Sequence, residues 1–155
     1  QLNPMADSVR ARDAQWQNHD LQMASKIARD SHRAVLQKWG GGGPFRVEFV
    51  LQFPGEQSHA VGNRIVIETA PLGMLPHAVH MFLEMASAGL YTGTRFNFAG
   101  SDMVTVNLEQ DDDADQLKKK FSDYTPAMSF PEYNDHFPHV EYTLGFMGRD
   151  PDGLP

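Results

Sequence analysis

The stretch that decides the fold covers residues 64–98 and reads RIVIETAPLGMLPHAVHMFLEMASAGLYTGTRFNF. The β-branched run at its start predicts a strand, and the apolar spacing that follows Pro76 predicts a helix over 76–88. Gly89 is expected to end that helix, because glycine adopts the left-handed conformation that helix ends favour. A new extended segment then begins near Phe96. The order is therefore strand, helix, strand.

A further strand is predicted immediately before this stretch. Residues 45–53 alternate between apolar and polar side chains, a pattern typical of a strand with one buried face. Pro54 and Gly55 end the run, and the polar loop that follows predicts an antiparallel return into residues 64–69. Two neighbouring strands with a shared apolar face imply a sheet that covers a core.

Three further strands are predicted after the helix. Residues 96–98 and 103–107 flank a turn, and residues 140–147 have the composition of another strand. The acidic run over 109–115 lacks the spaced oxygen ligands and central glycine of a calcium loop, so it is interpreted as a solvated loop.

The N-terminal 39 residues form a separate unit in this interpretation. No glycine or proline interrupts residues 5–38, which predicts one helix roughly 50 Å long. Its apolar residues make broken stripes, so the helix is expected to pack on its own domain or on a partner. Trp16 and Trp39 are the candidate docking residues, since tryptophan often anchors interfaces. Residues 40–44, four glycines and a proline, are expected to uncouple this arm from a domain over 45–155.

Charge and composition narrow the possible partners. The net charge of −7 divides into +2 for residues 1–39 and −9 for the remainder, and an acidic body repels phosphate backbones. We therefore expect protein partners and no nucleic acid. The sequence contains no cysteine, which excludes disulfides and thiol catalysis but leaves the redox compartment open. No apolar run approaches the ~20 residues of a membrane span, and an organelle lumen or a membrane-associated complex both remain compatible.

Two histidine pairs are candidate metal ligands. His77 and His80 are three residues apart on the predicted helix, and His136 and His139 have the same spacing in a loop. A zinc site usually has at least three protein ligands, and neither pair has an evident third. We expect no metal and no cofactor.

Three segments resemble the cyclophilins, the peptidyl-prolyl isomerase family. The similarity lies, in the same order along the chain, in a Gly-x-Ile-Val-Ile-Glu-Leu strand, a helix start and a glycine-rich turn of that family. These correspond here to residues 62–68, 76–82 and 89–96. The resemblance covers about residues 45–153, and it implies that His77 and His80 are surface histidines that face solvent. It implies a mostly β fold with helices: an antiparallel β-barrel carrying a proline-binding groove, here preceded by the long N-terminal helix. The family's second helix and closing strands have no counterpart before Pro155, so we expect the sequence to cover only part of that domain.

The same resemblance assigns the groove and its catalytic position. Phe98 stands where the family has its catalytic arginine, and Arg95 falls on the opposite face of the strand by alternation. A guanidinium can hydrogen-bond a prolyl amide as it twists, and a phenyl ring offers no donor. The resemblance places these other residues along the groove: Met103, Val104, Val106, Met147, Gly148 and Arg149.

The sequence thus predicts a cyclophilin-like protein-binding or structural module with weak or no isomerase activity. Its N-terminal helix is expected to dock it in a larger, multi-subunit assembly. The alternative is a divergent but active prolyl isomerase, in which an apolar groove alone favours the twisted amide.

Overall fold

The structure is a computed structural model of the 155-residue chain, and it describes residues 4–53, 62–98, 104–107, 132–138 and 140–146. These residues form two helices and two antiparallel sheets of two strands each. The elements in chain order are α1 (Pro4–Trp39), β1 (Arg46–Val50), β2 (Arg64–Glu68), α2 (Pro76–Ser87), β3 (Arg95–Phe98) and β4 (Val104–Asn107). The expected mixture of helix and strand is confirmed, whereas the described residues contain no closed barrel.

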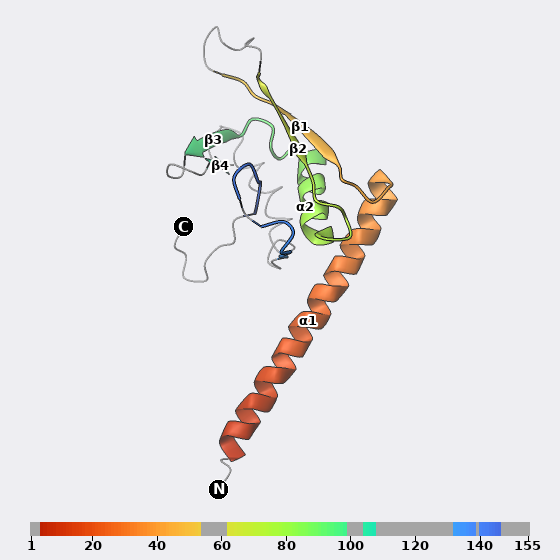
Figure 1. The fold of residues 1–155 in the computed structure, drawn as a ribbon, viewed down its shortest axis with the longest axis vertical. Coiled ribbons are helices and arrows are strands. Elements are labelled where there is room, and N and C mark those ends of the chain that lie inside the picture. Colours follow the sequence, from red (N-terminus) through yellow and green to blue (C-terminus); the bar gives the residue numbers. More distant parts are fainter. Residues whose placement is uncertain (1–3, 54–61, 99–103, 108–131, 139, 147–155) are drawn as a thin grey trace.

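Helix α1 is one uninterrupted element, as its composition predicts. Its C-terminal turns lie against α2, while its N-terminal turns extend away from α2 and from both sheets (Figure 1). The described helices include none that combines the length and apolarity needed to cross a membrane. The long helix therefore has one end built into the domain and one end that projects from it.

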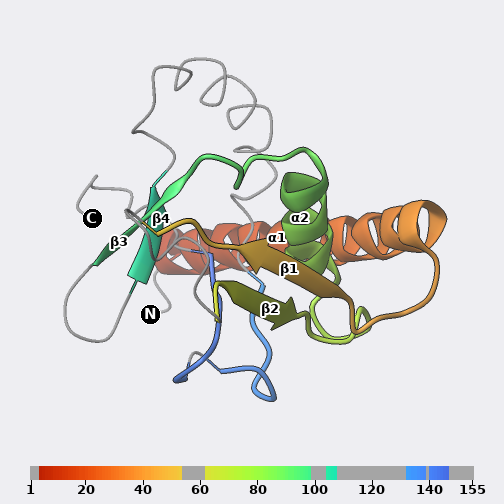
Figure 2. The same cartoon turned by 90° about the horizontal axis from the view of Figure 1, so that it is seen from above.

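Strands β1 and β2 make an antiparallel pair in which Val47 lies opposite Ile67. The predicted alternation is confirmed in β1, because Val47 and Phe49 are half-buried while their neighbours are exposed. Phe49 packs on α2 and on the turn after it, with ring centroids 6.3 Å from Phe82 and 5.4 Å from Tyr91. The sheet thus covers one side of α2 (Figure 2).

Helix α2 begins at the predicted residue and ends one residue before the predicted end. Pro76 is its first residue, which suits a position whose N–H has no helical acceptor. Gly89 has φ of +71°, the left-handed conformation that stops the helix at little steric cost. The buried members of the core cluster come from α1, α2 and the loop between β2 and α2; they are Val35, Leu72, Val79, Phe82 and Leu83.

The glycine segment does not uncouple α1 from the domain at this end of the helix. Gly40 and Gly43 both have positive φ values, so the backbone reverses direction within a few residues. The Leu72 N–H then donates to the Gly42 carbonyl oxygen at 3.0 Å. This turn holds the last part of α1 against α2, and Val35 is fully buried there.

Strands β3 and β4 form the second predicted pair, with Phe98 opposite Val104. The strand predicted over 140–147 is wrong for its described part, because residues 140–146 form a turn and exposed irregular structure. The Thr143 N–H and hydroxyl both donate to the Val140 carbonyl oxygen, at 3.2 and 2.7 Å. Those local bonds close a turn where a strand would need a partner ladder.

Candidate functional site

The β3–β4 hairpin brings together three of the residues assigned to the groove. Phe98 pairs with Val104 and Phe96 pairs with Val106, and residues directly opposite in an antiparallel pair share a face. Because side chains alternate along a strand, these two pairs lie on the same face of the hairpin. Phe96 and Val104 are 46% and 50% exposed. We call these four residues the hairpin apolar face.

Arg95, which alternation places off the groove face, pairs with Asn107, and the register puts both on the face opposite the hairpin apolar face. The positions of Met103, Met147, Gly148 and Arg149 and the side chain of Phe98 lie outside the described residues. By register, the described strands therefore bring only apolar residue types to the face that the resemblance assigns to the groove.

Trp39 packs on its own domain. It is half-buried against the core cluster, and its ring meets His80 edge-on at a centroid distance of 6.5 Å. Lys38 Nζ lies 4.6 Å from the centroid of the same ring. Trp16 belongs to the projecting part of α1, and its side chain lies outside the described residues.

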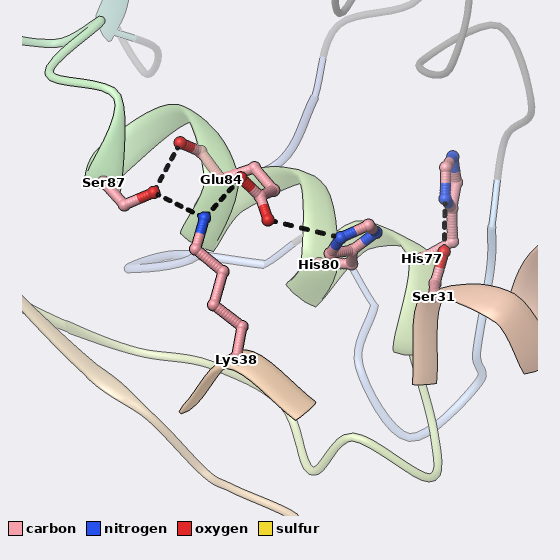
Figure 3. Close-up of polar contacts among 6 residues, drawn as sticks. All are labelled: Ser31, Lys38, His77, His80, Glu84 and Ser87. Carbon is pink, nitrogen blue, oxygen red and sulfur yellow. Dashed lines mark hydrogen bonds and ion pairs between the residues drawn. The ribbon is translucent and has the colours of Figure 1, made fainter. Parts of the chain in front are cut away.

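His77 is a buried residue, which corrects the expectation of a surface histidine. Its ring Nδ1 and the Ser31 hydroxyl share a hydrogen bond of 3.1 Å, and both residues are more than nine-tenths buried. The bond joins α2 to α1 across 46 positions of sequence (Figure 3). Buried this deeply, the pair joins the two helices and offers no nucleophile to a substrate.

Glu132 reaches the N-terminus of α2 from the far end of the chain. Its carboxylate accepts a hydrogen bond of 2.9 Å from the Ala78 N–H, one of the donors that a helix leaves without an internal acceptor. Burial raises the pKa of Glu132, and the bond from Ala78 opposes that shift in part. The Asn134 side chain adds a bond of 3.3 Å to the Met74 carbonyl oxygen. Residues 132–134 thus cap α2 and the loop before it.

A charged cluster lies about two helical turns farther along the junction than the Ser31–His77 bond. Lys38 Nζ is 2.7 Å from a carboxylate oxygen of Glu84 and 3.5 Å from the Ser87 hydroxyl (Figure 3). The other Glu84 oxygen lies 3.6 Å from His80 Nε2. Burial lowers the pKa of His80, while Glu84 acts in the opposite direction. The cluster holds the end of α1 on the exposed side of α2.

The candidate metal site at the histidines has no ligand set among the described residues. The described part of the chain has no group of three or more histidine, aspartate or glutamate side chains that could hold an ion. The ring Nδ1 and the backbone N–H of His136 lie within hydrogen-bonding distance of the Asn134 side-chain oxygen, and His139 lies outside the described residues.

The sequence analysis identifies neither the buried Ser31 that bonds His77 nor the Glu132 that caps α2. Ser31 lies four residues before Val35 on one side of the helix, and that spacing was the available signal for a buried position. Glu132 is 54 residues from the N–H that it caps, so no local pattern could identify it.

Comparisons of this chain with protein-family models, with curated proteins and with solved structures found no match. The functional argument therefore depends on the residues themselves and on the motif resemblance.

Proposed function

We propose that this chain is a cyclophilin-like protein-binding or structural module with weak or no prolyl isomerase activity, docked in a larger assembly through α1. The observation that carries the proposal is the hairpin apolar face. Phe98 stands at the position that the resemblance assigns to the catalytic arginine, opposite Val104. By register, neither this pair nor the Phe96 and Val106 pair beside it brings a donor side chain to the face.

The chemistry of proline isomerisation explains why this matters. Rotation about the prolyl amide breaks its resonance, at a barrier of about 18–20 kcal/mol. A positioned cation can stabilise the twisted amide by hydrogen bonding, and that contribution is absent from a face of phenylalanine and valine. Such a face still suits a contact with apolar segments of another protein, because Phe96 and Val104 are half-exposed.

The direct test is a prolyl isomerisation assay on a standard proline peptide, run beside an ordinary cyclophilin. The protein must first show a cooperative unfolding transition, so that a slow rate is not the result of misfolding. We expect isomerisation near the uncatalysed rate. A rate within about tenfold of the ordinary enzyme, or about 1.4 kcal/mol in activation free energy, rejects the proposal in favour of a divergent active isomerase.

The docking role of α1 needs a separate truncation. Removing the whole of residues 1–39 would delete Ser31 and Val35, which are buried in the domain. Removing residues 1–20 leaves those contacts intact and deletes only projecting helix. The shortened protein should sediment in cell extract as a smaller complex than the intact protein. Identical sedimentation of the two would contradict docking through this part of α1.

A further inference from the structure

Strand β2 lies at an edge of its sheet within the part of the chain that the structure describes. The sheet consists of β1 and β2, so one side of β2 faces β1 and the other faces no described strand (Figure 2). The Thr69 N–H donates to the Phe45 carbonyl oxygen at 2.8 Å. Hydrogen-bonded pairs alternate with non-bonded pairs in an antiparallel ladder, so the odd-numbered residues of β2 are the ones that bond β1. The backbone groups that point away from β1, toward the outer edge of β2, are those of Arg64, Val66 and Glu68.

The side chains at this outer edge leave apolar surface exposed on both faces of the sheet. Ile65 lies on the same face as Ile67, which packs on the core cluster, yet Ile65 is 42% exposed. Val66 lies on the other face and is 58% exposed. Arg64 and Glu68 share that face, and each makes an ion pair with a charged residue of β1. Outward backbone groups beside exposed β-branched side chains favour pairing with another strand.

The sequence of β2 is complementary to its own reverse. It reads Arg-Ile-Val-Ile-Glu, with a basic residue at one end, an acidic residue at the other and three β-branched residues between them. Two copies paired antiparallel about Val66 place Arg64 opposite Glu68 of the second copy. Val66 then lies opposite Val66, and Ile65 lies opposite Ile67. Each charge in the strand therefore meets the opposite charge, and each apolar side chain meets another apolar side chain.

Backbone geometry selects the same register. The residues that it sets opposite each other at the edge are the even-numbered ones, whose N–H and carbonyl groups point outward, and three such pairs exchange about six hydrogen bonds. A shift of two residues would place Arg64 or Glu68 opposite Val66, and a shift of four would place like charges opposite each other. Strand β1 lacks this property, because pairing it with itself over its full length would place Glu48 opposite Glu48.

We propose that β2 pairs with β2 of a second copy of this chain, antiparallel about Val66. The two sheets then become one sheet with the strand order β1–β2–β2–β1, and α2 of both copies lies on the same side of it. The interface is isologous, and its twofold axis passes between the two Val66 residues. This surface is separate from the hairpin apolar face and from the docking role of α1, so the inference does not depend on the proposed function.

The ion pairs with β1 determine what the charges contribute to this contact. Arg46 Nε is 2.8 Å from a carboxylate oxygen of Glu68, so in the dimer Glu68 lies between Arg46 and Arg64 of the second copy. Exposed ion pairs add little stability, so the charges select the register while the backbone bonds and apolar contacts stabilise the pairing. A strand of five residues buries less than the roughly 1,200 Å² of a stable, specific complex. The dimer therefore forms only as the protein is concentrated.

Sedimentation equilibrium of the intact protein, from about 10 μM to about 1 mM, measures this association. Arg64→Glu and Glu68→Arg each set like charges opposite each other at both ends of the paired strands, so each variant alone should associate about tenfold more weakly or less. An equal mixture of the two variants sets opposite charges at both ends again. We expect the mixture to dimerise as the unmodified protein does.

The matched control is Arg33→Glu, which reverses an exposed arginine on α1, away from β2, and should leave the dimer unchanged. Urea denaturation checks that all variants are folded, and their midpoints should be similar because every substituted residue is exposed.

Three results would overturn the proposal. A monomer at every concentration excludes the second copy and makes a strand of another protein the occupant to test. A dimer that Arg64→Glu or Glu68→Arg leaves unchanged forms through another surface. Single variants that both lose the dimer, and do not regain it when mixed, exclude the antiparallel register about Val66.

Discussion

The α1–α2 junction and the β3–β4 hairpin use similar residues in opposite ways. Val35 is fully buried in the junction, whereas Val104 is half-exposed on the hairpin. The junction combines that apolar contact with the Ser31–His77 bond and the Lys38–Glu84 ion pair. The hairpin has two strands of four residues each, and such ribbons are at best marginally stable alone.

The comparison indicates that the α1–α2 junction stabilises the fold and that the hairpin contributes much less to folding stability. Burial of apolar surface against several elements stabilises the junction, so its residues are needed for folding. The hairpin apolar face buries less and leaves large side chains accessible, so its residues can change with little effect on folding. The proposed binding role is therefore assigned to the hairpin apolar face, where Phe96 and Val104 expose apolar surface.

The largest expected effect comes from making the same valine-to-alanine substitution in each of the two regions. Val35→Ala should lower the free energy of unfolding by about 2 kcal/mol, because two buried methyl groups are lost and a cavity remains. Val104→Ala should lower it by about 0.5 kcal/mol or less, since that side chain is half-exposed. Urea denaturation measures both. Equal losses of unfolding free energy in Val35→Ala and Val104→Ala would contradict the distinction between the junction and the hairpin.

A smaller effect is expected from the polar bond within the junction. Ser31→Ala removes the hydroxyl bonded to His77 Nδ1 and should cost about 1 kcal/mol. Ser25→Ala, at an exposed position of the same helix, serves as the matched control and should be nearly neutral. Urea midpoints compare the two. A neutral Ser31→Ala would mean that the bond joining α1 to α2 adds nothing to stability.

The smallest expected effect is a pH dependence that belongs to the junction. Burial lowers the pKa of His80 below its ordinary value of 6.5 in the folded state. Its contribution to stability is therefore present above 6.5 and is lost as the pH falls through the folded pKa. Between about pH 7.5 and about pH 5 the unmodified protein should lose more unfolding free energy than His80→Gln. If the unfolding free energies of the two proteins fall equally over this pH range, His80 does not cause the pH dependence of the junction's stability.

Local chemistry made most of the elements predictable. Alternation identified β1, and Pro76 and Gly89 marked the ends of α2, because those signals act within a few residues. The long helix was predicted to within one residue at each end. The strand predicted over 140–147 failed in its described part because alternation does not supply a partner, and Thr143 closed a turn instead.

The tertiary contacts could not be predicted in the same way. Ser31 meets His77 and Glu132 meets Ala78 across 46 and 54 residues, and neither pairing has a local signal. The composition of the glycine run predicts a flexible linker, because composition alone does not show that the Gly42 carbonyl oxygen accepts a hydrogen bond from the Leu72 N–H. The groove assignment came from the resemblance, and the strands add the register that places Phe98 opposite Val104.

The central claim is that the position of Phe98 contributes no catalysis, and its most direct test is prolyl exchange in a proline peptide followed by NMR with the unmodified protein, Phe98→Ala and Asn97→Ala. Asn97 is the matched control, because it is adjacent in β3 and lies on the opposite face of the hairpin. The account predicts that none of the three accelerates exchange beyond the uncatalysed rate. Acceleration by the unmodified protein that is lost in Phe98→Ala and kept in Asn97→Ala would contradict it.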